Sequence, residues 1–179
     1  MNIRKASLKD IPSLNILVNS AYRGEGSKKG WTTEADLLDG IRTTERTLTE
    51  MLKRPDAVIV LAEEETDIKA CVYLEKQGDA LYLGMLTVKP ELQGKGIGAT
   101  LMTAAEDHAL YVGCNKIRMT VITARKELIE YYQRKGYQDS GERKPFPDDP
   151  EFGIPKQDLE FFVMEKELKL AQRLPHTEK

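Results

Sequence analysis

Residues 86–99 read LTVKPELQGKGIGA, and this stretch does most to decide the fold. It begins with an apolar, β-branched segment that ends before Pro90, and glycines follow at every second position from 94 to 98. In residues 101–109, after this stretch, apolar side chains recur at helical spacing. The pattern predicts a strand, a glycine turn and a helix. Such a turn lets several backbone N–H groups converge at the positive end of the helix dipole. We expect it to bind a phosphate or pyrophosphate.

Two nucleotide-binding motifs can be compared with this turn. A nucleotide triphosphatase loop requires Ser or Thr directly after Gly-Lys, whereas a glycine follows Lys95, so this class is excluded. The dinucleotide fingerprint G-x-G-x-x-A is formally matched by residues 94–99. However, the turn follows an antiparallel meander, and the next predicted strand, 116–122, ends without the acid that binds a ribose. A dinucleotide-binding protein therefore stays only as an alternative.

The rest of the chain alternates between short strands and helices. Three apolar segments joined by two short polar turns predict an antiparallel meander before the glycine turn. The predicted strands are 2–5, 57–62, 68–75, 80–88, 116–122 and 159–164, with an extended segment from Tyr137. Helices are predicted at 11–22, after the glycine turn, and at 126–135. A further helical region is predicted to start at Thr32 or Thr33, to be split in two by Gly40 and to end at Pro55. We expect a mobile loop at 23–30 and a proline-rich loop at 145–156.

Composition narrows the classes of protein and partner. The chain has 179 residues, 40% of them hydrophobic, which suits one domain with a real core. Its 27 Lys and Arg against 29 Asp and Glu give a net charge of −2, which disfavours nucleic acid as the main partner. Cys71 and Cys114 indicate neither a zinc site nor a disulfide framework, and His108 and His176 form no metal constellation. With no signal peptide and no apolar run of membrane length, we expect a cytoplasmic protein.

The turn and the residues before it resemble the GNAT superfamily of acyl-CoA-dependent N-acyltransferases. The family signature is Gln/Arg-x-x-Gly-x-Gly/Ala after a strand that ends in Val-x-Pro. Here Gln93-x-x-Gly96-x-Gly98 follows Val88-Lys89-Pro90. The order of predicted elements also fits. The resemblance implies an α/β (α+β) GNAT-like fold, with a mixed central sheet of about seven strands flanked by about four helices. It implies a single GNAT-like acyltransferase domain at 1–170, followed by a polar tail at 171–179.

The resemblance also implies acetyl-CoA as a cosubstrate. In this family the backbone N–H groups of the turn hold the pyrophosphate, and the pantetheine arm pairs with the exposed edge of the meander's last strand. Arg125 replaces an asparagine of the family, and its guanidinium is a further candidate for a phosphate contact. The implied cofactor-binding residues are Leu86, Thr87, Val88, Gln93, Gly94, Lys95, Gly96, Ile97, Gly98, Ala99 and Arg125.

A second family pattern, Asn-x-x-Ala-x-x-Leu-Tyr-x-x-x-Gly-Phe, corresponds to residues 125–137, RKELIEYYQRKGY. Tyr132 falls on the family's tyrosine, whose phenol is thought to protonate the departing thiolate. The resemblance therefore implies that Tyr132 is a catalytic general acid; the alternative is that it only packs against the cofactor. Leu128 and Tyr131 depart from the family pattern. Tyr82 stands where some histone-type members carry their acidic base.

The proton acceptor and the acyl acceptor remain open. Candidates for the general base are Glu34, Asp36 and Asp39, each of which could instead be a cap or a solvated surface acid, and a chain of water molecules is a further alternative. Aromatic residues that could wall an acceptor pocket are Trp31, Tyr22 and Phe146. Cys71 and Cys114 read as core residues, which disfavours transfer through a cysteine.

We therefore expect an N-acetyltransferase that moves an acetyl group from acetyl-CoA to a primary amine by direct attack in a ternary complex. The partner would be an amine-bearing small molecule or peptide, with no nucleic acid or membrane partner, and a homodimer is compatible with the family. The alternative from another class is a non-catalytic acyl-CoA-binding sensor or interaction module.

Overall fold

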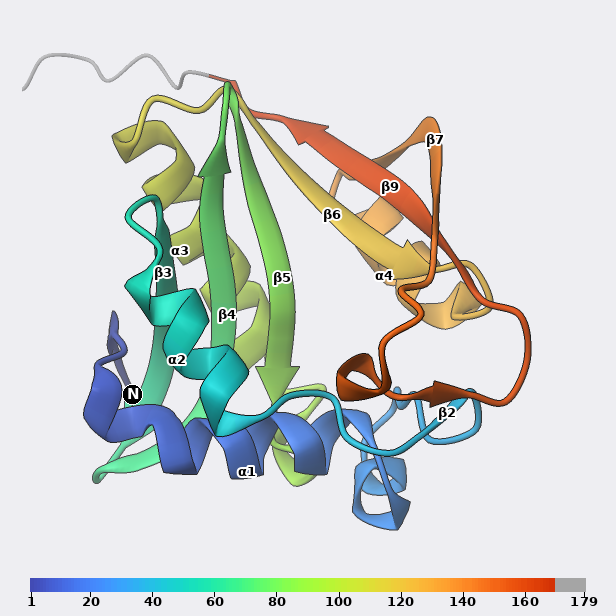
Figure 1. The fold of residues 1–179 in the computed structure, drawn as a ribbon. Helices are drawn as coiled ribbons and strands as arrows, with labels where there is room; N and C mark the ends of the chain where they lie inside the picture. Colours follow the sequence, from blue (N-terminus) through green and yellow to red (C-terminus); the bar gives the residue numbers. More distant parts are fainter. Residues whose placement is uncertain (170–179) are drawn as a thin grey trace, which may run out of the picture.

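A computed structural model describes residues 1–169 as a seven-stranded mixed sheet with helices on both faces (Figure 1). The sheet has the order β1-β3-β4-β5-β6-β9-β7, and only the pairing of β5 with β6 is parallel. Its strands are β1 (Asn2–Lys5), β3 (Ala57–Glu64), β4 (Asp67–Gln77), β5 (Ala80–Val88), β6 (Lys116–Ile122), β9 (Glu160–Glu167) and β7 (Gln138–Pro145). This confirms the expected fold class and the antiparallel meander.

Four α-helices and four 3-10 helices connect these strands. The α-helices are α1 (Ile11–Tyr22), α2 (Glu45–Lys53), α3 (Ile97–Tyr111) and α4 (Lys126–Arg134). The 3-10 helices are η1 (Leu8–Asp10), η2 (Glu25–Lys29), η3 (Pro90–Leu92) and η4 (Pro150–Phe152), and a separate two-stranded sheet joins β2 (Leu38–Asp39) to β8 (Ile154–Pro155).

The core has two parts because successive side chains of a strand point to opposite faces of the sheet. Val60 and Val72 face one side, where they pack with the apolar stripe of α3, including Leu101. Ile59 and Cys71 face the other side and pack with α1 and α2. The continuous apolar run predicted as a strand at 57–62 is thus buried on both faces, as expected for a central strand covered by two helical layers.

The feature that creates the site is the divergence of the two parallel strands. β5 pairs with β6 only over Ala80–Tyr82, and the strands separate beyond that point (Figure 1). A register irregularity between β4 and β5 accompanies the divergence, and Met85 there has a φ of 54°. Since a bulge bends its strand and increases the local twist, it turns the end of β5 away from β6. The β6-facing edge of residues 83–88 therefore has no neighbouring strand within residues 1–169.

The helix predicted from Thr32 or Thr33 is wrong. Residues 32–43 form turns and the short strand β2, and the helix of this region begins only after Thr44, whose side chain accepts from Thr47 N at 3.1 Å. The physical reason lies at Glu34, whose carboxylate does not serve a helix start but is buried against two guanidinium groups. The loop expected at 23–30 contains η2.

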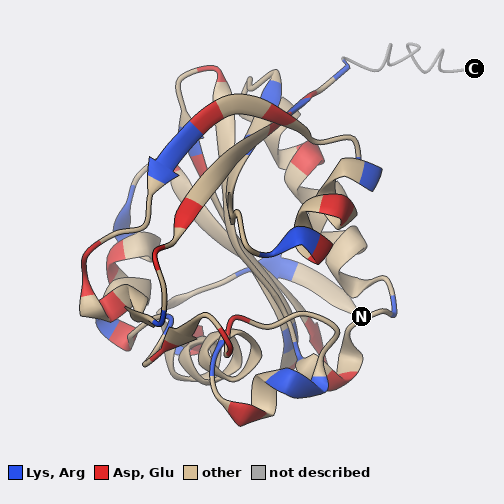
Figure 2. Ribbon diagram, turned by 90° about the vertical axis from the view of Figure 1, so that its right-hand side faces the viewer, with Lys and Arg blue, Asp and Glu red and all other residues tan. Residues whose placement is uncertain are grey.

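Within the described residues, no helix is long and apolar enough to cross a membrane. The face that carries β7 and β9 intermixes Lys and Arg with Asp and Glu (Figure 2). The polar tail predicted at 171–179, which includes His176, lies outside the described residues, and the domain boundary at 170 stays a prediction.

Candidate active site

The glycine turn places a row of backbone N–H groups at the start of α3. Gly94 and Gly96 have φ angles of 80° and 84°, a region that side chains other than glycine rarely adopt, and Gly96 is the N-cap. Along residues 94–100, the first N–H group with a backbone acceptor is that of Thr100, bonded to Gly96 O at 3.1 Å. The preceding N–H groups are therefore available to a ligand at the positive end of the helix.

A cleft of about 410 Å³ lies between this turn and the diverging end of β5. α4 supplies the opposite wall through Leu128, Tyr131 and Tyr132. Every residue predicted to bind the cofactor lines this cleft except Lys95, whose side chain is exposed. The structure therefore brings together segments that are far apart in the sequence, although no bound molecule tests their individual roles.

Two side chains hold the carbonyl groups at the end of β5. Tyr22 Oη donates to Leu86 O at 2.8 Å, and Gln93 Nε2 donates to Val88 O at 3.3 Å. Gln93 Oε1 in turn accepts from Trp31 N at 3.0 Å. A Cβ atom at Gly30 would lie 2.1 Å from Gln93 Oε1, so a larger residue there would displace the Gln93 amide from this position. The sequence prediction assigned Gln93 through its backbone and missed this side-chain role.

Tyr132 stands where the large cleft meets a second, smaller cavity, and it lines both. Its side chain is buried with 6% exposure, and burial raises the pKa of its phenol well above the usual value of 10.0. Its ring lies edge-on to those of Tyr131 and Tyr137, at centroid distances of 5.4 and 5.8 Å. Because its pKa is raised, the phenol keeps its proton at neutral pH and presents an O–H donor at the junction, although burial also makes it a weaker acid than a phenol in water.

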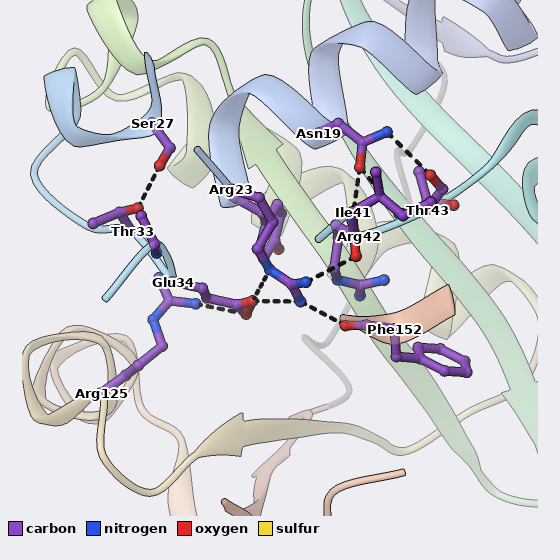
Figure 3. Close-up of polar contacts among 12 residues, drawn as sticks. Asn19, Arg23, Ser27, Thr33, Glu34, Ile41, Arg42, Thr43, Arg125 and Phe152 are labelled. Carbon is purple, nitrogen blue, oxygen red and sulfur yellow. Dashed lines mark hydrogen bonds and ion pairs between the residues drawn. The ribbon is translucent and has the colours of Figure 1, made fainter. Parts of the chain in front are cut away.

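A buried ion network crosses the floor of the site (Figure 3). Glu34 Oε2 accepts from Arg23 at 3.1 and 3.2 Å, and its Oε1 accepts from Arg125 Nη1 at 3.3 Å. Arg23 also donates to Ile41 O and Phe152 O, both at 2.8 Å. Burial lowers the pKa of Arg23, and the adjacent Glu34 carboxylate counteracts this shift. The network joins α1, the 32–43 segment, α4 and the loop after β7.

This network changes the expectations for two predicted residues. Arg125, predicted to contact a phosphate, lines the cleft, but its guanidinium donates to Glu34 and to Thr32 Oγ1 at 2.6 Å. Glu34 is neither a cap nor a solvated acid, because it is 5% exposed and faces the smaller cavity. Both of its oxygens accept from guanidinium groups, which stabilises the ionised carboxylate and disfavours Glu34 as the proton acceptor for an amine.

The smaller cavity, of about 200 Å³, borders the large cleft and has aromatic walls. Its borders with the cleft are Tyr22, Leu86, Arg125, Leu128 and Tyr132, which line both. Tyr22 and Phe146, predicted as possible walls of an acceptor pocket, both line it, whereas Trp31 lines the large cleft and packs against Tyr131 at 5.5 Å between ring centroids. Phe152 and Phe161 complete the aromatic wall.

The other candidate acids lie elsewhere. Asp36 is exposed and pairs with Lys28 at 3.6 Å, and Asp39 is exposed and pairs with Lys156 at 3.4 Å. Neither lines one of the two cavities. Tyr82 lines the smaller cavity, so a phenol faces it at the position where some family members carry an acid.

A cysteine nucleophile and a metal site each depend on side chains that can be located among residues 1–169. Cys71 and Cys114 are both buried, as expected of core residues, and burial raises the pKa of the Cys71 thiol to about 12. Over this same range, no group of three or more His, Cys, Asp and Glu is arranged to hold a metal ion.

Sequence reasoning missed Arg23 and Arg42, which both line the smaller cavity. No local signal marks them, because an arginine just after a helix or inside a loop is usually a solvated surface residue. The partners of Arg23 lie 11, 18 and 129 residues further along the chain.

Comparison with known proteins agrees with this geometry. The profile of the acetyltransferase (GNAT) family matches residues 29–137, more than half of the chain. A thialysine N-epsilon-acetyltransferase from Bos taurus is 34% identical over 67 residues, which are 37% of this chain and 39% of that protein. The match thus spans about two fifths of the length of this curated relative.

Solved structures show the same fold. The ribosomal-protein-S18-alanine N-acetyltransferase from Escherichia coli superposes with a TM-score of 0.68 at 14% identity, covering 97% of each chain. The PaiA N-acetyltransferase from Thermoplasma acidophilum, solved in complex with coenzyme A, superposes with a TM-score of 0.65 at 20% identity, covering 93% of this chain and 98% of that one.

Proposed function

The chain belongs to the acetyltransferase (GNAT) family, and we propose on this basis that it transfers an acetyl group from acetyl-CoA to a primary amine by direct attack in a ternary complex. One observation carries the proposal. Two cavities meet at Leu86 and Tyr132, one lined by the glycine turn and the other by aromatic side chains. Direct transfer requires two substrates to approach one another at such a junction.

The residues of the large cleft fit a pyrophosphate and an extended amide-bearing arm. The N–H groups of 94–99 are free to donate to phosphate oxygens at the start of α3. The edge at Leu86, Thr87 and Val88 has no β6 partner and can pair with amide groups in the manner of an added strand, beside the bonds that the Leu86 and Val88 carbonyls accept from Tyr22 and Gln93. Use of an acyl-CoA is also supported by the structural neighbour from Thermoplasma acidophilum, which holds coenzyme A.

Acetyl-CoA would supply the thioester carbonyl and a thiolate leaving group at this junction. Tyr132 Oη would donate its proton to the thiolate as general acid. A backbone N–H group of residues 86–88 would donate to the oxygen that gains negative charge during attack. Because both Glu34 oxygens accept from arginines, water in the smaller cavity would carry the proton away from the amine.

The amine enters from the smaller cavity in this proposal. Curated relatives are thialysine N-epsilon-acetyltransferases, which supports an amine as acceptor. Tyr22, whose hydroxyl donates to Leu86 O, separates the two cavities and would position the amine beside the thioester.

A second candidate is an acyl-CoA sensor that binds without turnover. One observation favours it: among residues 1–169, the smaller cavity is lined by a single carboxylate, that of Glu34, and both of its oxygens already accept from arginines. Tyr82 likewise replaces a carboxylate base. The two candidates share the cleft and differ only in turnover.

Calorimetric titration with acetyl-CoA and, separately, with NADH tests the cofactor first. We expect acetyl-CoA to bind and NADH to give no signal; binding of NADH alone would favour the dinucleotide alternative. Thiol release with a panel of amines then separates the enzyme from the sensor, since a sensor binds acetyl-CoA and acetylates none of the amines.

A further inference from the structure

The smaller cavity presents a guanidinium group whose backbone is fixed from α1. Asn19 Oδ1 accepts from Arg42 N at 2.7 Å and from Thr43 N at 3.1 Å, and Asn19 Nδ2 donates to Thr43 O at 3.0 Å (Figure 3). Three hydrogen bonds from one side chain hold this turn of the 41–43 segment. The position of Arg42 at the cavity wall is thus built into the fold and does not depend on a flexible loop.

The side chain of Arg42 lines the smaller cavity. Its guanidinium carbon lies 5.2 Å from the centroid of the Tyr22 ring, and the residue is partly buried. Within residues 1–169, this guanidinium forms neither an ion pair nor a hydrogen bond. Partly buried arginines usually have an anionic or carbonyl partner, because their five N–H donors otherwise lose hydration without compensation.

The charges that line the cavity are unbalanced. Its charged side chains are Arg23, Arg42, Arg125 and Glu34, three cations against one anion, which leaves a net charge of 3 − 1 = +2. Arg23 and Arg125 already share the two oxygens of Glu34, so the unmatched cation that is free to bind is Arg42. Inside a concave, low-dielectric wall such an excess attracts an anion more strongly than it would at an open surface.

We propose that the acyl acceptor carries a carboxylate as well as its amine, and that Arg42 binds this carboxylate. The proposal rests on the function proposed above. A guanidinium pairs with a carboxylate through two parallel hydrogen bonds, which fixes orientation as well as position.

Tyr22 lies between Arg42 and the proposed reaction centre. Arg42 lies over the Tyr22 ring, and the hydroxyl of the same ring donates to Leu86 O at the junction of the two cavities. A molecule held by its carboxylate at Arg42 therefore extends its amine along Tyr22 toward Leu86. A cavity of about 200 Å³ with aromatic walls fits a small amino acid better than a protein side chain presented on a folded surface.

Matched pairs of acceptors test the carboxylate directly. Glycine, β-alanine, γ-aminobutyrate and phenylalanine are compared with the amines that lack only the carboxylate: methylamine, ethylamine, propylamine and phenethylamine. Thiol release from acetyl-CoA is measured at one pH, and each kcat/KM is expressed per concentration of the neutral amine present at that pH. We expect at least one amino acid to be used with a kcat/KM about 10- to 100-fold above that of its partner. Short peptides that carry an acidic side chain are tested as a second set of acceptors. Their use would show that the carboxylate can come from a peptide rather than from a free amino acid.

Two variants assign the effect to Arg42. Arg42→Met is expected to raise KM for the amino acid about 10- to 100-fold, with a small change in kcat and little effect on the amine without a carboxylate. Lys53→Met removes one positive charge from the exposed end of α2, away from both cavities, and should change neither value. Thermal unfolding of each variant verifies that it is folded.

A binding measurement keeps the proposal independent of turnover. The protein saturated with coenzyme A is titrated with N-acetylglycine and with N-methylacetamide, which lacks the carboxylate. If no amine is acetylated but N-acetylglycine still binds and Arg42→Met abolishes this binding, the proposed enzyme function fails and the carboxylate site stands. Equal use of both members of every acceptor pair, or binding and kinetics that Arg42→Met leaves unchanged, would overturn the carboxylate site.

Discussion

Replacing Glu34 with glutamine removes the only anion from the buried network while keeping the side-chain volume. The variant leaves Arg23 and Arg125, which are 5% and 6% exposed, without a countercharge in the interior. Removing one partner of a buried ion pair costs about 3–5 kcal/mol, because the remaining charge is desolvated and uncompensated. We therefore expect a large loss of stability although the substitution only replaces one carboxylate oxygen with an amide nitrogen.

The geometry places the expected loss at the lower end of that range. The contacts of Glu34 with the two arginines measure 3.1–3.3 Å, longer than the about 2.7–2.9 Å of strong charge-assisted hydrogen bonds. Arg23 also keeps its bonds to Ile41 O and Phe152 O. We expect Glu34→Gln to lower the free energy of unfolding by about 3 kcal/mol, which for a chain of this size lowers Tm by about 6–12 °C.

Urea unfolding followed by circular dichroism measures this loss, with an unchanged m-value expected. Asp36→Asn in the same segment is the matched control, because Asp36 is exposed and its change should cost less than about 0.5 kcal/mol. A double-mutant cycle with Arg125→Met should give a coupling energy, since the two side chains interact directly. A loss below about 1 kcal/mol for Glu34→Gln, or additive effects in the cycle, would refute the reasoning.

Three further predictions follow from the site and from one surface ion pair. Tyr132→Phe should lower kcat by about 10²- to 10⁴-fold with acetyl-CoA affinity unchanged, and undiminished turnover would remove the general-acid role. Gly96→Ala should weaken acetyl-CoA binding measured by calorimetry, because the backbone φ of 84° at this position strains any residue other than glycine. Gly26→Ala, at a position with open space around it, is the control. Equal affinities of the two variants for acetyl-CoA would contradict the role assigned to the turn. A hydrogen bond from Arg4 lowers the pKa of Asp10 from 3.8 to about 2. Because the pKa of Asp10 is lower in the folded than in the unfolded state, its ionised carboxylate stabilises the fold fully above about pH 4, and this stabilisation is lost as the pH falls from about 4 through 2. The free energy of unfolding of Asp10→Asn should therefore fall less over that interval than that of the natural chain. Identical pH profiles of the free energy of unfolding would exclude this contribution.

The sequence alone determined the parts of the fold that depend on local rules. The segment 86–99 predicted a strand, a turn and a helix because glycine spacing, Pro90 and apolar periodicity act within a few residues of one another. The meander was readable for the same reason: β-branched runs alternate with short polar turns. The resemblance carried by this segment was then enough to predict the family, which the profile match confirms.

Only the tertiary structure determined which charged side chains are buried together at the site and which remain available to a ligand. The helix predicted from Thr32 or Thr33 failed because the buried pairing of Glu34 with Arg23 and Arg125 outweighs the weak helix signal of its first turn. The guanidinium of Arg42, which has no hydrogen-bond or ion-pair partner among residues 1–169, likewise reaches the cavity wall only once Asn19 and Tyr22 are brought beside it. Ion pairs and cavity walls join residues far apart in the chain, and the free energy of burying a charge depends on that three-dimensional environment, which local sequence patterns do not record.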